Sequence, residues 1–120
     1  MNDVQALVTQ AQALGAALVA HPTVRAYYEA QRAVRGDGGA QQLLREYEAH
    51  VERLHRLEAE QKPIEVADKH KLREMETNLA GNALLKTLMR TQADYAALMA
   101  QINRAIDGPL ADLAAKEPRA

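Results

Sequence analysis

The scarcity of β-branched residues limits the fold of this chain more than any other feature of its sequence. Of its 120 residues only fifteen are Val, Ile or Thr, whereas Ala and Leu together account for 39. The dominant residues Ala, Leu, Glu, Gln, Arg and Lys lose little conformational entropy in a helix, while strands favour β-branched and aromatic residues. The sequence therefore predicts an all-α fold.

Helix-breaking residues divide the first forty positions into two helices. The first is expected from about Asp3, a good N-cap, and its apolar residues form one stripe at spacings of three and four: Leu7, Ala11, Leu14 and Leu18. His21-Pro22 ends this helix, and Pro22 suits the first turn of a second helix because its missing N–H would be unpaired there. Three glycines within residues 36–39 then predict a loop with positive φ angles.

Three further helices are expected after this loop. Their predicted ranges are Ala40 to Gln61, ended by Lys62-Pro63; Glu65 to Ala80, stopped by Gly81; and a helix capped by Asn82 that runs to Asp107. Gly108-Pro109 is expected to break the last helix, which leaves residues 110–113 as a short extra turn before a frayed tail at 117–120.

The lengths of these helices favour an elongated arrangement. A compact domain of this size has a diameter of about 35 Å, whereas the third and last helices would be roughly 33 and 39 Å long. We therefore expect one domain over residues 1–116, built as an elongated helical hairpin or bundle of about five helices. Its wide apolar stripes would leave a large exposed patch on a monomer, so the sequence predicts a homodimer or docking to another helical protein.

Missing residue types exclude several functions. The chain has no Cys and no Ser, so thiol and serine nucleophiles, disulfides and cysteine-ligated metal clusters are excluded. No pair of carboxylates is marked out for acid–base catalysis, and the sequence predicts a protein that is not an enzyme and has no cofactor. It also shows no signal peptide and no run of eighteen apolar residues, which predicts a cytoplasmic protein without a membrane span.

The last long helix carries the predicted interface. Apolar residues alternate three and four apart along it, as in a coiled coil, and one polar residue on this seam would fix the register at a cost in stability. The predicted interface residues are Leu88, Gln92, Tyr95, Met99, Ile102 and Ile106.

Two patterns would support other functions. Glu52 and His55 have the Glu-x-x-His spacing of di-iron helix bundles, although they flank the apolar stripe and the further inward carboxylates that such sites need are lacking. Glu46 and His50 lie four apart and are interpreted as an exposed pair on a charged helix. The metal-binding bundle remains an alternative that these two patterns leave open.

A basic run gives the second alternative, a direct RNA-binding module. It consists of Lys62, Lys69, Lys71 and Arg73. Acidic residues interrupt the run, no aromatic side chain is present to stack on a base, and residues 61–120 sum to only +1, with nine basic and eight acidic side chains. We therefore expect a salt-bridged helix face here and no direct contact with nucleic acid.

The order and spacing of several helical motifs resemble the YlbF/YmcA family of small bacterial proteins. The resemblance covers nearly the whole chain and rests on Leu43-Leu44-Arg45-Glu46-Tyr47, Glu60-Gln61-Lys62-Pro63-Ile64-Glu65, Leu72, Asn82-Ala83-Leu84-Leu85, Gln92-Ala93-Asp94-Tyr95 and Leu98 to Ile106. It implies an all-helical, dimer-forming, non-enzymatic regulator. Relatives in this family regulate competence, sporulation and biofilm formation, and they join each other and a third protein in a complex that influences ribonuclease Y and messenger-RNA processing.

The chain departs from the family in one respect. Some members carry cysteine-bound iron–sulfur clusters, which this cysteine-free chain cannot hold, so no functional site is carried over from them. The leading hypothesis is a homodimeric adaptor that binds other proteins, including family relatives and a ribonuclease complex, through a helical face.

Overall fold

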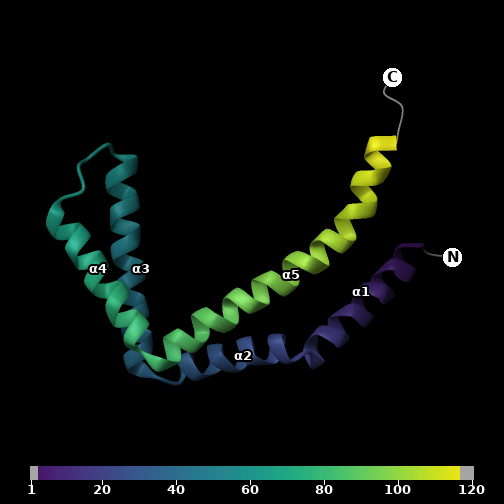
Figure 1. Ribbon diagram of the computed structural model, residues 1–120, viewed down its shortest axis with the longest axis horizontal. Coiled ribbons are helices and arrows are strands. Elements are labelled where there is room, and N and C mark those ends of the chain that lie inside the picture. Colours follow the sequence, from purple (N-terminus) through teal and green to yellow (C-terminus); the bar gives the residue numbers. More distant parts are fainter. Residues whose placement is uncertain (1–2, 117–120) are drawn as a thin grey trace. The chain divides into compact units, whose positions relative to one another are not determined.

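The computed structural model describes residues 3–116, and this range forms five helices and no strand (Figure 1). They are α1 (Asp3–Ala20), α2 (Pro22–Arg35), α3 (Gly38–Ala59), α4 (Val66–Gly81) and α5 (Ala83–Lys116). The predicted all-α fold is confirmed, and the third and last helices are the two longest, as expected. The expected tail at 117–120 lies outside the described residues.

The chain forms two compact units. Unit 1 comprises residues 1–27 and 91–120, so it contains α1, the first turn and a half of α2 and most of α5. Unit 2 comprises residues 28–90 and contains the rest of α2, all of α3 and α4, and the first turns of α5. The single domain expected over residues 1–116 stays a prediction.

The boundary between α1 and α2 lies where the sequence placed it. Pro22 is the first residue of α2, and the ring of His21 caps that helix, because its Nδ1 accepts a hydrogen bond from the N–H of Thr23 at 3.1 Å. This bond satisfies one of the amides that a helix start leaves unpaired. It also requires the neutral His21 ring to carry its proton on Nε2.

The glycine-rich loop is shorter than expected. α3 begins at Gly38, and no glycine within residues 3–116 has a positive φ, so the prediction of positive φ at residues 36–39 is wrong. Asp37 is the reason: it has an extended backbone with φ −117°, and its Oδ1 accepts the N–H of Ala40 at 2.9 Å. A side-chain N-cap of this kind starts a helix without a left-handed residue.

α3 ends in a different way from the proline stop that the sequence predicted. The N–H of Gln61 donates to the carbonyl of Glu58 at 3.1 Å, and the N–H of Lys62 donates to that of Leu57 at 2.8 Å. This is the hydrogen-bond pattern of a Schellman motif, which needs a left-handed residue just after the helix. Gln61 takes that role with φ 58°, although glycine is usual there.

α5 continues through Gly108-Pro109, so the predicted break is wrong. The helix extends to Lys116 with Pro109 inside it, and Figure 1 shows it curving in its last third. A proline removes one backbone hydrogen bond and presses on the preceding turn, and a helix can absorb this by bending. At the other end the predicted cap is confirmed, because Asn82 Oδ1 accepts the N–H of Leu85 at 3.1 Å.

The core of unit 2 lies where the ends of its helices meet. Four buried residues from α2, α3, α4 and α5 form it: Val34, Ala40, Leu79 and Leu85. Half-buried side chains pack around them, namely Leu43, Leu44, Tyr47, Leu84 and Leu88. The residues that α3 and α4 contribute to this core lie in the first turns of α3 and the last turn of α4, so the distal part of the α3–α4 hairpin extends beyond the core.

The strained end of α3 gives a prediction. Replacing Gln61 with Gly should raise the free energy of unfolding by about 1 kcal/mol, because a left-handed conformation costs an L-residue about that much and costs glycine almost nothing. Urea denaturation followed by circular dichroism would measure the change. Gln61→Ala is the control and should give no gain; an equal gain from both variants would contradict the assignment of strain to this residue.

Candidate protein-interaction surfaces

A buried histidine joins α3 to the start of α4. His50 is only 5% exposed, and its Nε2 lies 3.0 Å from the backbone carbonyl oxygen of Asp68. Because a carbonyl can only accept, the Nε2 of His50 must be the donor. The interpretation of Glu46 and His50 as an exposed pair is therefore wrong for His50, whose burial depends on the docking of α4.

An ion pair strengthens the same junction. Arg53 Nη1 binds Asp68 Oδ1, and Asp68 Oδ2 also accepts the N–H of Glu65 at 3.4 Å at the start of α4. The hydrogen bond from Arg53 is the main cause that holds the pKa of Asp68 below its usual value of 3.8. Desolvation opposes this shift, and the positive charge of Arg53 adds to it. His50, Arg53 and Asp68 thus fix the register of the two helices.

The hairpin presents an apolar groove on one face. We use this name for the groove of about 430 Å³ whose floor is Tyr47, Val51, Leu54, Ile64 and Leu72. Of these only Leu54 is buried, and the other four are half-buried. Charged side chains form its rim: His55 and Glu58 on the α3 side, and Lys69 and Glu76 on the α4 side. Such a groove is suited to the apolar side of another helix.

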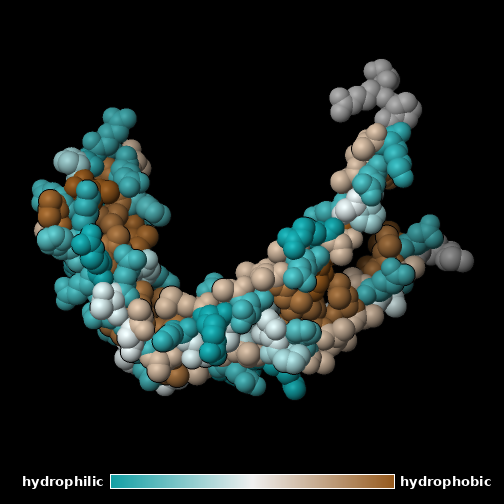
Figure 2. Space-filling view, viewed as in Figure 1, coloured by the Kyte–Doolittle hydropathy of each residue, from teal (hydrophilic) through white to brown (hydrophobic). Residues whose placement is uncertain are grey.

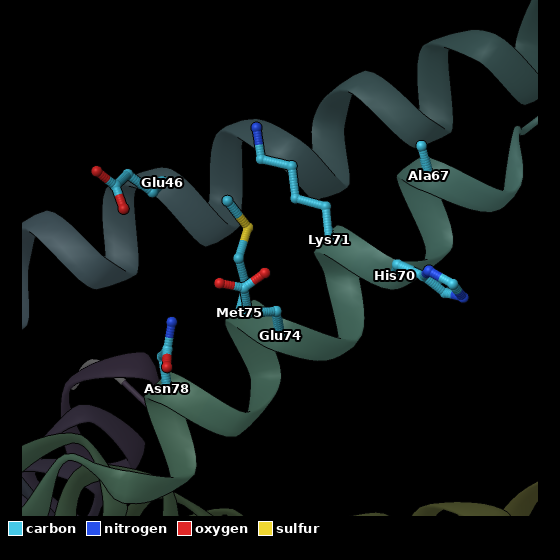
Figure 3. A pocket seen from close by; sticks show the side chains of 7 residues that line it. All are labelled: Glu46, Ala67, His70, Lys71, Glu74, Met75 and Asn78. Atoms are coloured by element: carbon cyan, nitrogen blue, oxygen red, sulfur yellow. The ribbon is translucent and has the colours of Figure 1, made fainter.

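A polar groove of about 510 Å³ lies on the opposite face of the hairpin (Figure 3). Its lining residues are Glu46, Ala67, His70, Lys71, Glu74, Met75 and Asn78. Figure 3 shows Lys71, Met75 and Asn78 pointing from α4 toward α3, whereas His70 points away. No group of three or more His, Asp or Glu side chains anywhere in residues 3–116 could hold a metal ion. We interpret this groove as a solvated face with charges of both signs.

α1 is the most exposed apolar element of unit 1. It contains no buried residue, although Asp3 is its only charged side chain and most of its residues are apolar. Five of its large apolar side chains are between 39% and 68% exposed: Val4, Leu7, Val8, Leu14 and Val19. A helix that is apolar on all sides is normally buried. The apolar side chains of α1 are therefore exposed to solvent, and another chain could bury them.

The C-terminal part of α5 adds to this exposed apolar surface. Ile106, Leu110 and Leu113 are 52%, 60% and 56% exposed. Their spacing of four and three continues the stripe of Tyr95, Met99 and Ile102 past Pro109. In Figure 2 the most hydrophobic side chains of unit 1 gather along α1 and the part of α5 beside it. We call the exposed apolar residues of α1 together with Ile106, Leu110 and Leu113 the unit 1 apolar surface.

The six predicted interface residues lie in both units. Leu88 packs against the core of unit 2. In unit 1, Tyr95 stacks on Tyr27 with ring centroids 4.7 Å apart, and Met99 and Ile102 are half-buried. Gln92 and Ile106 are exposed. The interface through these residues stays a prediction, and Ile106 is the one that belongs to the unit 1 apolar surface.

The residues behind the two alternative functions do not form single sites. Within the basic run, Lys69 borders the apolar groove, Lys71 lines the polar groove, and Lys62 pairs with Glu60 at 3.0 Å. Residues two apart on a helix point to opposite sides, which explains this division. Glu52 and His55 are both exposed on α3, with no third metal ligand grouped with them in the described part of the chain.

Sequence reasoning missed most of the unit 1 apolar surface. The sequence predicts the apolar stripe along α1, but periodicity alone does not show whether a stripe faces the chain's own core or another molecule. A usable signal was available, because α1 has one charge in eighteen residues, too few for a helix with a solvated side. Leu110 and Leu113 were missed because the helix was expected to end before them.

These features define a class: an all-helical protein that exposes apolar helix faces and has no group of three or more His, Asp or Glu side chains that could hold a metal ion among residues 3–116. The family model described as control of competence regulator ComK, YlbF/YmcA matches residues 7–111. The chain belongs to this family, as the resemblance of its motifs predicted.

A solved structure shares the fold. The chain is similar to one in the crystal structure of Bacillus subtilis RicA in complex with RicF, with a TM-score of 0.73, 16% sequence identity, and coverage of 94% of this chain and 99% of the other. At this identity the likeness shows the fold alone. The comparison with curated protein sequences returned no match. In the part of the chain that is described, no helix is long and apolar enough to cross a membrane.

The junction at His50 gives a prediction with a matched control. His50→Ala should lower the free energy of unfolding by about 1–3 kcal/mol, because it removes a buried side chain and its hydrogen bond to the Asp68 carbonyl. His55→Ala, one turn further along α3 and exposed, should change it by less than about 0.5 kcal/mol. Thermal and urea denaturation would measure both. Equal effects would mean that His50 does not join the two helices.

Proposed function

We propose that this protein is a non-enzymatic regulatory adaptor of the cytoplasm, which self-associates through the unit 1 apolar surface and binds other proteins. The observation that carries the proposal is α1, a helix of eighteen residues with a largely apolar sequence and no buried residue. Exposed apolar patches of monomeric proteins are usually limited to about 300–600 Å², and larger ones mark interaction sites.

A second copy is the partner that we infer for this surface. Asp3 is the only charged side chain of α1, so the α1 helices of two identical copies can meet with little charge repulsion. Two-fold symmetric dimers are the commonest oligomers, and two copies of α1 with two copies of the α5 stripe would make a four-helix bundle. The bundle would include Ile106 and extend the predicted seam of Tyr95, Met99 and Ile102.

Family membership supports the regulatory part of the proposal. The family description names control of a competence regulator, and a protein of this fold was crystallised with a second protein, RicF. By analogy we infer that the chain's other partners include a relative of its own family, in a complex that modulates ribonuclease-dependent processing of messenger RNA. A protein that acts by holding others needs no catalytic group of its own.

Sedimentation velocity over a concentration series tests the self-association. The wild-type chain should sediment as a dimer at micromolar concentration, and Leu110→Glu should raise the dissociation constant about tenfold or more, because it places a charge in an apolar interface. The control is Ala97→Glu, an exposed position on the opposite side of α5, which should leave the dimer intact. A wild-type monomer at these concentrations, or equal effects of the two variants, would contradict the proposal.

A further inference from the structure

A single residue joins consecutive helices at two places in this chain. His21 lies between α1 and α2, and Asn82 lies between α4 and α5. The backbone of each linking residue bonds in the same way. Its N–H donates to the carbonyl three residues earlier, at 3.0 Å for His21 and 3.1 Å for Asn82, and its carbonyl accepts the N–H four residues later, at 3.0 and 2.9 Å. The two joints therefore have the same backbone hydrogen bonds.

The side chains of the two joints differ in chemistry. Asn82 Oδ1 accepts the N–H of Leu85 at the start of α5, and His21 Nδ1 accepts the N–H of Thr23 at the start of α2, both at 3.1 Å. An amide oxygen accepts a hydrogen bond at any pH near neutrality, whereas an imidazole nitrogen accepts only while it carries no proton. Histidine is the side chain whose charge ordinarily changes between about pH 5 and 8. The structure thus has one joint with a titratable cap and one with a fixed cap.

Protonation of His21 removes the cap of α2. The residue is exposed, so a proton reaches the ring and the charged ring is free to turn into solvent. The charged ring has two N–H donors and no acceptor, so the N–H of Thr23 loses its hydrogen bond. Pro22 has no N–H, which makes the amide of Thr23 the first one of the helix. The cap is therefore present at high pH and is lost as the pH falls.

The charges on α1 and α2 do not compensate for this loss. α1 has no basic side chain in its last turn, and its only charge, Asp3, is at its far end. On α2 the nearest charge is Arg25, which is exposed. The ends of the two helices act on a charged His21 ring in opposite directions, because a helix C-terminus attracts a positive charge and an N-terminus repels it. The hydrogen bond to Thr23 is therefore the interaction that protonation changes on these two helices.

The packed helix α5 adds no ion pair to His21. It runs antiparallel to α1 in unit 1 (Figure 1), and the stacking of Tyr27 on Tyr95 places His21 level with about residue 101. The charged residues of α5 nearest this level are Arg104 and Asp107, which are exposed and opposite in sign. Among residues 3–116 neither of these side chains pairs with His21. No charge on α5 thus holds the ring in one protonation state.

We propose that His21 makes the joint between α1 and α2 a pH-sensitive device. The neutral ring caps α2 and fixes the joint, whereas the protonated ring releases the cap and loosens α1. Five of the eight residues of the unit 1 apolar surface lie on α1. A loosened α1 then weakens the dimer as the pH falls, a step that rests on the proposed self-association.

Amide exchange of the full-length protein, measured residue by residue by NMR, tests the joint. Protection compares the observed exchange rate of an amide with the rate of an unstructured chain at the same pH. For Thr23 it should fall about three- to tenfold between about pH 7.5 and pH 5.5, because a lost side-chain cap usually changes the stability of a helix start by about this factor. The amide of Leu85 is the internal control, because Asn82 caps it, and its protection should stay constant.

Two variants locate the effect. His21→Asn gives the first joint the residue that caps α5, so the protection of the first amides of α2, those of Thr23 and Val24, should not depend on pH over this range. His55→Asn removes another exposed histidine, on α3, and should leave the fall at Thr23 as large as in the wild-type chain.

Sedimentation velocity at the same two pH values tests the consequence for self-association. The dissociation constant of the wild-type dimer should rise about threefold or more as the pH falls, because the α1 that supplies most of the surface is held less firmly. The dissociation constant of His21→Asn should change less than about twofold. His55→Asn should behave as the wild-type chain does.

Three results would overturn the inference. They are Thr23 protection that is the same at both pH values, an equal fall in the wild-type chain and in His21→Asn, and a dissociation constant with the same pH dependence in these two proteins. A wild-type monomer at both pH values would instead contradict the proposed self-association, and the amide of Thr23 alone would then decide whether the joint is sensitive to pH.

Discussion

A pair of helices can bury only the strip of side chains that lies between them, and this constraint governs both units of the protein. In unit 2 the helix ends converge on Val34, Ala40, Leu79 and Leu85, but the hairpin beyond them has a single layer and buries little more than Leu54 and His50. In unit 1 the almost uncharged helix α1 has no buried residue. Apolar area that a compact domain would place in its core is therefore exposed here and available to other molecules.

Binding to such a surface is specific only if the helices that form it keep a fixed register. In unit 2 polar interactions set that register, because His50 and Arg53 of α3 both bind Asp68 in the first turn of α4. A purely apolar contact between two helices could slide, whereas these directional bonds hold one alignment. A local hydrogen-bonded junction therefore holds the apolar groove of the hairpin in one arrangement.

Much of the fold can be predicted from neighbouring residues in the sequence. The features that cannot be predicted in this way depend on contacts between helices. Pro22 and Asn82 were placed correctly because a helix start depends on neighbouring residues alone. The continuation of α5 past Pro109 could not be predicted from the same rules, since a proline can either end a helix or bend it. The sequence alone predicts an exposed His50, because the burial of its ring depends on α4, which is distant in sequence. The apolar stripes of the candidate surfaces can be predicted from the periodicity of the sequence. Which of these stripes stay exposed cannot be predicted from it.

Hydrogen–deuterium exchange of the α1 amides at several protein concentrations tests the central claim most directly, because it reports whether another chain covers this helix. If apolar faces are covered by association, α1 and residues 106–113 of α5 should exchange more slowly as the concentration rises through the dimer range. The α3–α4 junction around His50 should exchange at a constant rate. Protection of α1 that is the same at all concentrations, in a protein that sediments as a monomer, would contradict the account.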